Sequence, residues 1–277
     1  MGSILDLEFK ITEFLMIYYR IKASIKMKSK VKSLITPIYY LGRESYIRLR
    51  GKMTESKIKS AFDIPIIINN RNRLTFPKKL IESLELKGYK NIYIIDNNSN
   101  YPPLLEYYKK CPYPVFRLKE NVGYLALWET DIYKQFIHDY YVYTDCDVVP
   151  TEECPNDFLD VFLKTMKANT RLMKIGLSLK IDDLPDYFKN KAEVIEWESQ
   201  YWKNESKDKR YYIANVDTTF ALYRPFVTGG ASRLKMYRST PPYSAYHMPW
   251  YNDSENLSEE EKFYIENAKT STHWTAK

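Results

Sequence analysis

The stretch Tyr140-Tyr141-Val142-Tyr143-Thr144-Asp145-Cys146-Asp147-Val148-Val149-Pro150 decides the fold expected for this chain. Its first half is an apolar run of strand length, rich in Tyr and Val, and Pro150 interrupts strand pairing at its end. Asp145 and Asp147 are one residue apart, and side chains two positions apart on an extended chain point the same way. We therefore expect two carboxylates just past the carboxyl end of a strand, where open α/β sheets bind ligands.

Two negative charges at one point repel each other, and a divalent cation between them removes the repulsion. Carboxylate oxygens are hard ligands that suit Mg²⁺ or Mn²⁺. The sequence thus predicts that Asp145 and Asp147 hold Mn²⁺ or Mg²⁺, and that this ion bridges the phosphates of a nucleotide. The alternative is a solvated turn, since Asp is common after strands.

The residues around this stretch alternate between strand and helix patterns. Apolar strands are expected at 64–69, 91–95 and 115–118, and helices at 74–86, 102–108, 123–137 and 157–166. Such alternation is typical of a parallel sheet with helices on both faces. Polar clusters follow four strands, at 69–73, 96–99, 120–123 and 145–147, so we expect them along one edge of the sheet.

Size and composition fit one large α/β domain with appendages. The chain has 277 residues and 44% hydrophobic residues, enough for a substantial core. We divide it into a basic amphipathic N-terminal extension (1–60), a catalytic core (61–225) and a C-terminal loop and helix that close the active site (226–277). Three cysteines are too few for a disulfide framework, and no signal-peptide pattern begins the chain, so we expect a cytoplasmic protein.

The positive charge lies in the N-terminal extension. Residues 1–60 hold 13 Lys and Arg against 5 Asp and Glu, while the remainder holds 29 against 30. An apolar helix followed by a basic run is typical of a peripheral contact with an anionic membrane surface, here the inner face of the membrane. The alternative is a helix packed on the body with a solvated basic face. Charge alone would also allow a nucleic-acid arm, but nothing downstream supports one, and we expect no nucleic-acid partner.

Four short motifs occur in order between residues 63 and 150. They are Asn72-Arg73 with Ser83-Leu84 ten residues on, Asp96-Asn97-Asn98-Ser99, Asn121-Val122-Gly123 and Asp145-Cys146-Asp147. With these motifs the chain resembles the nucleotide-binding half of a family 2 glycosyltransferase of GT-A fold. The resemblance implies a Rossmann-like α/β fold with a mostly parallel central sheet flanked by helices, here carrying a helical basic N-terminal extension.

The resemblance also implies roles for the motif residues. Asp96 would read the nucleobase or ribose, and Asn121 and Gly123 would line the nucleotide pocket. Asp145 and Asp147 would hold the metal on the diphosphate, with Asp147 as the more direct ligand. The remaining residues placed in the nucleotide site are those of the first turn, Arg71, Asn72 and Arg73.

Two further functional residues are expected downstream of the Asp-x-Asp motif. In inverting enzymes of this fold an acidic residue takes the proton from the acceptor hydroxyl, and Asp217, flanked by apolar residues, is our candidate for that base. Several such enzymes use a His as third metal ligand, and His247 is the candidate, with His273 as its competitor.

Three other features carry alternatives. Trp197 and Trp202 either pack in the core or floor an acceptor-sugar site. Asp182-Asp183 is more simply a capped turn than a second metal site. Ser258 with Glu261 predicts a capping box that opens a helix through Ala268, preceded by a loop able to close over the donor.

The sequence therefore predicts a metal-dependent glycosyltransferase that moves a sugar from a nucleotide-sugar donor, with a UDP-sugar favoured. The acceptor would be a hydroxyl of a glycan or lipid-linked molecule, and the reaction inverting. One alternative is a membrane-associated nucleotide-sugar binding protein without turnover. The other is a sugar-phosphate nucleotidyltransferase, which we disfavour because that class is expected to carry a Gly-rich loop after its first strand, and residues 69–73 contain no Gly.

Overall fold

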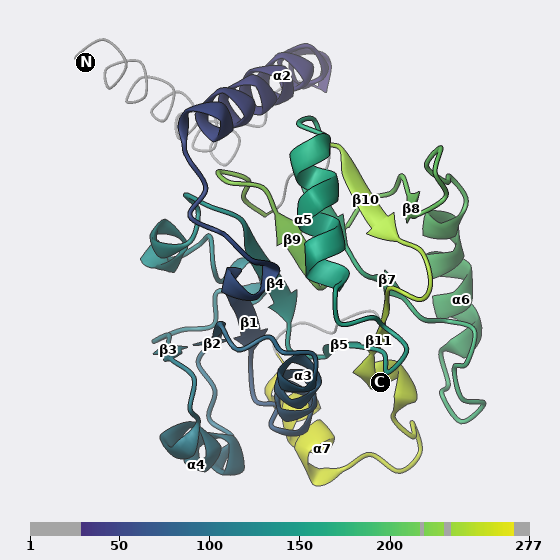
Figure 1. The fold of residues 1–277 in the computed structure, drawn as a ribbon. Helices are drawn as coiled ribbons and strands as arrows, with labels where there is room; N and C mark the ends of the chain where they lie inside the picture. Colours follow the sequence, from purple (N-terminus) through teal and green to yellow (C-terminus); the bar gives the residue numbers. More distant parts are fainter. Residues whose placement is uncertain (1–28, 217–218, 230–233, 269–277) are drawn as a thin grey trace. The chain divides into compact units, whose positions relative to one another are not determined.

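A computed structural model describes residues 29–216, 219–229 and 234–268. The chain forms two compact units, 1–46 and 47–277, and the division falls within helix α2 (Ser29–Met53). In the described part of the chain, all the strands and the other helices lie in the second unit (Figure 1). Among the described residues, no helix is both long enough and apolar enough to cross a bilayer.

An eight-stranded sheet forms the centre of the second unit, in the order β3-β2-β1-β4-β9-β6-β10-β8. The first four strands run parallel, and β9 and β8 run opposite to the rest. Their bounds are β1 Ile66–Asn70, β2 Ile92–Asp96, β3 Val115–Arg117, β4 Tyr141–Asp145, β6 Lys174–Gly176, β8 Tyr211–Tyr212, β9 Ala221–Tyr223 and β10 Met236–Ser239. This mostly parallel sheet flanked by helices confirms the predicted fold class.

The central strands are apolar on both faces because helices cover them. α3 (Thr75–Leu86) turns Phe76, Leu80 and Leu84 inward and packs against β5 (Val148–Pro150). α5 (Phe158–Ala168) buries a stripe of five apolar side chains against β6 and β9. α4 (Pro102–Lys110) begins with two prolines, which suit the first helical turn because they lack the amide hydrogen that would go unpaired there.

A smaller three-stranded sheet continues from the end of β4. It has the order β5-β11-β7, with β7 at Ser178–Leu179 and β11 at Ser244–His247. β11 pairs antiparallel with β5, so that His247 lies opposite Val148. The last two helices are α6 (Lys191–Ser199) and α7 (Glu259–Asn267), and Figure 1 shows α7 beside α3.

Three expectations were wrong in detail. Residues 123–137 contain only two short 3-10 turns, Gly123–Leu125 and Asp131–Gln135, in place of a helix. β4 ends at Asp145 and a tight turn at 146–147 leads into β5, so Asp145 and Asp147 do not lie on one extended strand. The capping box is only half formed, because Ser258 accepts from the Glu261 amide while the Glu261 carboxylate points elsewhere.

Candidate functional site

The carboxyl ends of the four parallel strands meet at one edge of the sheet. In the pairing register Asn70 lies opposite Asp96, Asn69 opposite Asp145, and Asp96 opposite Arg117. The turns that follow these strands therefore lie side by side, as the sequence predicted. In an α/β sheet this is the edge at which ligands bind.

The turns after β1 and β2 are locked together by buried side chains. Asn72 has a positive φ of 54° and no exposed surface, and its Oδ1 accepts from the amides of Asn100 and Tyr101. Its own amide donates to Ser99 Oγ at 2.8 Å. An Asn tolerates this left-handed conformation better than most residues do. Asn72 thus holds the turns after β1 and β2 together at this edge of the sheet.

Asp96 is fully buried, and both of its carboxylate oxygens have partners. Oδ1 accepts from the Ser99 amide at 3.1 Å, and Oδ2 accepts from Arg117 Nε at 2.9 Å. The side chain of Arg117 is 56% exposed, so it covers Asp96 from the solvent side.

The Asn-x-Gly motif forms the third turn of the edge. Asn121 Oδ1 accepts from the amide of Gly123, whose φ of 82° favours glycine. Asn97 bridges to this turn, donating to the Gly123 carbonyl at 2.8 Å and accepting from the Val122 amide. A Cβ on Gly123 would meet nothing within 4 Å, so this turn borders open space.

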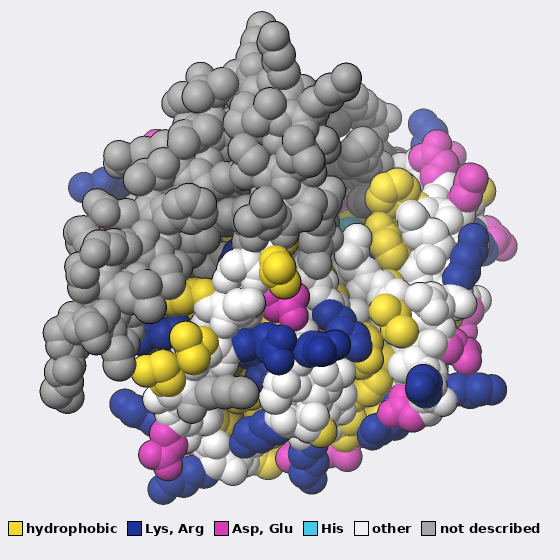
Figure 2. All heavy atoms as spheres, turned by 90° about the horizontal axis from the view of Figure 1, so that it is seen from above, with side chains coloured by type: hydrophobic (Ala, Val, Ile, Leu, Met, Phe, Trp, Pro, Cys, Tyr) yellow, Lys and Arg dark blue, Asp and Glu magenta, His cyan; other side chains and the backbone are white. Residues whose placement is uncertain are grey.

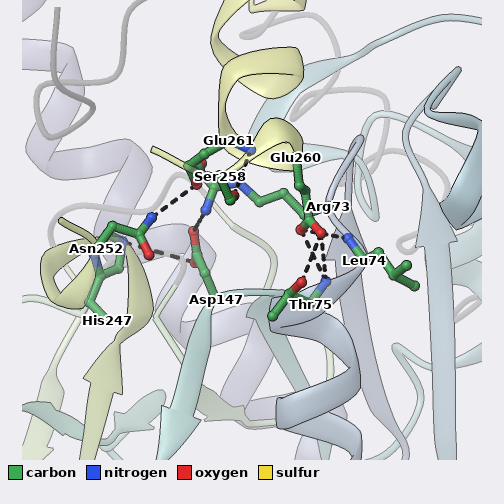
Figure 3. A network of polar contacts seen from close by, with 9 residues as sticks. All are labelled: Arg73, Leu74, Thr75, Asp147, His247, Asn252, Ser258, Glu260 and Glu261. Carbon is green, nitrogen blue, oxygen red and sulfur yellow. Dashed lines mark hydrogen bonds and ion pairs between the residues drawn. The ribbon is translucent and has the colours of Figure 1, made fainter. Parts of the chain in front are cut away.

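Asp147 is the centre of the polar network in Figure 3. Its Oδ1 lies 3.9 Å from His247 Nε2, and its Oδ2 lies 3.6 Å from Arg73 Nη1. Because ligand bonds to Mg²⁺ are about 2.1 Å long, two ligands of one ion lie at most about 4.2 Å apart. The spacing of Asp147 and His247 is compatible with both binding the same cation.

His247 is held in the form that binds metals. Burial lowers the pKa of His247 from its ordinary 6.5, Arg73 acts in the same direction, and Asp147 opposes them. The imidazole is therefore neutral at pH 7, as a metal ligand must be. Its Nδ1 finds no hydrogen-bond partner in the described part of the chain.

The protein alone does not form a complete cage for a cation. The described residues contain no group of three or more His, Cys, Asp or Glu side chains placed to hold a metal. Mg²⁺ and similar ions are commonly bound by one or two carboxylates together with substrate phosphates and water. Asp147 and His247 fit such a site, in which a diphosphate supplies the remaining oxygens.

Helix α7 is hydrogen-bonded to the first turn of α3 (Figure 3). The Glu260 carboxylate accepts from the amides of Leu74 and Thr75 at 2.8 and 3.0 Å, which caps the start of α3. The Glu261 carboxylate pairs with Arg73 at 2.6 Å. Arg71 donates to the carbonyl of Asn267 at the other end of α7. The C-terminal helix is therefore part of the edge.

The structure brings most of the predicted site residues together. Those at the edge are Arg71, Asn72, Arg73, Asp96, Asn121, Gly123, Asp145, Asp147 and His247. Asp217 and His273 lie outside the described residues. Trp197 is 51% exposed and is not a core residue, while Trp202 stacks on Tyr212 and packs against the core.

Four residues at this edge of the sheet were not predicted from the sequence as site residues: Asn97, Arg117, Glu260 and Glu261. Asn97 stands within a recognised motif, and its bridging role has no signature of its own. Glu260 and Glu261 look like ordinary first-turn acids of a capped helix. Their partners lie 185 residues away or more, so only the tertiary fold reveals them.

The burial of two cysteines gives a testable prediction. Burial raises the pKa of Cys154 to about 12 and that of Cys146 well above its usual value, whereas Cys111 is partly exposed. Because the thiolate is the reactive form, Ellman's reagent at pH 8 should modify one thiol rapidly and the other two only after unfolding. The Cys111→Ser variant should show no fast thiol; a fast thiol remaining in that variant would contradict the burial of Cys146 and Cys154.

Comparison with known proteins adds information on the fold. No model of a known protein family matches the chain, and no curated protein matches its sequence. Similar solved structures include S. aureus TarS 1–349, with a TM-score of 0.39 and 13% identity over 75% of this chain and 66% of that one. GalNAc-T7, solved with UDP, GalNAc and Mn²⁺, gives a TM-score of 0.42 and 12% identity over 64% and 42%.

A third similar structure is glucosyl-3-phosphoglycerate synthase from Mycobacterium tuberculosis with Mn²⁺ and UDP-glucose. Its TM-score is 0.37, with 9% identity over 80% of this chain and 78% of that one. The chain spans less than two thirds of the first two structures. A cytidylyltransferase from Leptospira borgpetersenii is also similar, with a TM-score of 0.39 and 13% identity over 76% and 99%.

Proposed function

We propose that this protein is a metal-dependent glycosyltransferase that uses a nucleotide-sugar donor. The observation that carries the proposal is the pair Asp147 and His247 at the carboxyl edge of the parallel sheet, 3.9 Å apart. The turns after β1, β2 and β3 lie at the same edge and would supply polar groups for a nucleotide. We favour a UDP-sugar as donor and Mn²⁺ or Mg²⁺ as the metal.

The metal would supply charge neutralisation for the departing nucleoside diphosphate. Asp147 and His247 would hold it, with Asp145 at the end of β4 as a further carboxylate of the motif. Arg73, buried beside Asp147, would donate from Nη1 to a phosphate oxygen. Asn121 and Gly123 would border the nucleotide, and Asp96 with Arg117 would face the base or ribose.

Asp217 is the proposed general base for the acceptor hydroxyl, with inversion at the anomeric carbon. The residues just before it are firmly held: the Val216 carbonyl accepts from buried Lys174 at 2.9 Å, and the Asn215 carbonyl accepts from Arg238. Phe220, after it, is fully buried.

The acceptor is proposed to be a glycan or a lipid-linked hydroxyl at an anionic membrane surface. The excess of Lys and Arg in residues 1–60 supports this, as do exposed Leu41, Leu49 and Met53 on α2. Figure 2 shows Lys and Arg side chains gathered with hydrophobic ones on the face seen from above.

The full chain should then sediment with phosphatidylglycerol vesicles but not with phosphatidylcholine ones, and salt should release it. Equal binding to both vesicle types would contradict an electrostatic contact.

Thermal unfolding with nucleotides tests the main proposal. UDP, GDP, dTDP and CMP are each added with Mn²⁺ and with a chelator. A ligand that binds only the folded protein raises the free energy of unfolding, by about 2.7 kcal/mol at a concentration of 100 Kd, and so raises the midpoint. We expect a rise for one nucleotide, UDP being favoured, that requires Mn²⁺. A protein that binds no nucleotide would not be a glycosyltransferase of this kind.

A nucleotidyltransferase is the other enzyme class to test. Such an enzyme would release pyrophosphate from a nucleoside triphosphate and a sugar phosphate. The glycosyltransferase releases a nucleoside diphosphate from a nucleotide sugar. The turn between β1 and α3 contains no glycine to wrap a triphosphate, which favours the glycosyltransferase.

A further inference from the structure

The guanidinium of Arg73 lies between two carboxylates at the candidate metal site. Nη2 is 2.6 Å from Glu261 Oε1, and Nη1 is 3.6 Å from Asp147 Oδ2 (Figure 3). The side chain of Arg73 is only 3% exposed. A buried cation of this kind needs a close negative partner, and Glu261 is much the closer of the two.

Aromatic rings also contact the guanidinium of Arg73, in addition to its two carboxylate partners. Its guanidinium carbon lies 3.9 Å from the ring centroid of Tyr264 and 4.8 Å from that of Phe76. Nε and Nη1 have no hydrogen-bond partner in the described part of the chain. Arg73 is thus a rigid positive charge whose free donor, Nη1, faces Asp147.

A positive charge beside Asp147 opposes the binding of a divalent cation to the same carboxylate. Glu261 cancels that charge at close range, and Arg73 cannot lose its proton to relieve the conflict. We propose that Glu261 is a positioning residue that sets the metal affinity of Asp147, by holding Arg73 and neutralising its charge. This inference rests on the proposed metal-dependent function and adds a residue that touches neither metal nor donor.

The surroundings of Glu261 hold it in this orientation. Asn252 Nδ2 donates to Oε2 at 3.1 Å, and Ser258 Oγ accepts from the backbone amide of Glu261. These contacts hold the carboxylate beside Arg73, although its place in the sequence suggested a helix cap.

Glu260 offers a matched control for this role. It is the neighbouring residue on α7 and carries the same charge, and it also joins α7 to α3. Its partners are the amides of Leu74 and Thr75 and the Thr75 hydroxyl, all at the start of α3. Glu260→Gln and Glu261→Gln therefore both weaken the attachment of α7, but only the second releases Arg73 toward Asp147.

The experiment measures Mn²⁺ binding to the full-length chain, by the electron paramagnetic resonance signal of free Mn²⁺, with and without UDP. We expect Glu261→Gln to weaken Mn²⁺ binding about 10- to 100-fold, the usual effect of removing a residue that supports a metal ligand. Glu260→Gln should bind Mn²⁺ as tightly as the unaltered protein, since Glu260 bonds the start of α3 and not Arg73. Thermal midpoints in chelator report the folding of each variant.

The outcomes separate this inference from the proposed function. If the unaltered protein binds no Mn²⁺ even with UDP, the metal-dependent function itself is wrong. If the unaltered protein binds Mn²⁺ and Glu261→Gln binds it equally well, or both glutamine variants lose it equally, the role of Glu261 is overturned. Should Glu261→Gln fail to fold, Asn252→Ala, which only loosens Glu261, must weaken Mn²⁺ binding more than Glu260→Gln does.

Discussion

Replacing Asp147 with Asn should lower the rate of sugar transfer by about 100- to 1,000-fold, the usual cost of removing one group that stabilises a transition-state charge. The neutral amide oxygen is a poor ligand for Mn²⁺, so the departing diphosphate would lose its counter-ion. Folding should be little affected, because Arg73 keeps its 2.6 Å ion pair with Glu261. The rate is measured as release of nucleoside diphosphate from the sugar nucleotide whose base gives the thermal shift.

Asp182→Asn is the matched control for this substitution. The Asp182 carboxylate is 68% exposed and pairs with Lys180, not with a residue of the Asp147 network. Its loss should leave the transfer rate unchanged and alter the free energy of unfolding by less than about 0.5 kcal/mol. An Asp147→Asn protein that transfers sugar at the full rate would remove the Asp-x-Asp motif from the mechanism.

The largest effect on stability is expected for Phe158→Ala. Phe158 is fully buried at the start of α5, and its ring lies 5.1 Å from that of Tyr89 and 5.5 Å from that of Phe220. Truncating such a ring removes apolar burial and leaves a cavity, so we expect a loss of about 3–5 kcal/mol. For a unit of this size the thermal midpoint should fall by roughly 10 °C.

Phe62→Ala controls for the chemistry of the Phe158 substitution. Phe62 contacts the same Tyr89 ring from the other side, at 5.1 Å, but it is 51% exposed. Its loss should cost less than about 1 kcal/mol, since most of its surface already faces water. Equal losses for the two variants, in thermal or urea unfolding, would contradict the burial of Phe158.

Periodicity and turn chemistry predicted the central half of the fold. The strands at 66–70, 92–96 and 115–117 and the helix at 75–86 match their predicted ranges closely. The carboxyl edge followed from the rule for parallel sheets, and so did the gathering of the motif residues there. Strand patterns, helix patterns and polar clusters after strands each occupy a short stretch of sequence, and each recurs several times along the chain.

The remaining errors have a tertiary cause. Residues 123–137 have a helical pattern, but Gly123 is held by Asn97 and Asn121, and Tyr143 donates to the Tyr124 carbonyl, so the segment is tied to the sheet edge as turns. Asp147 lies close to His247 because β5 pairs with β11. No local sequence pattern predicts that pairing. Glu261 has a good cap position yet a stronger partner in a buried arginine.

The attachment of α7 to α3 has a consequence for synthesis. Leu74 and Glu260 are 186 residues apart, so the ribosome adds the second partner about 10–40 s after the first, at 5–20 residues per second. Until then a nascent chain exposes the uncapped start of α3 and carries Arg73 without Glu261. We expect this edge to be the last part of the sheet to mature, and released fragments lacking 258–268 to be preferred clients of chaperones.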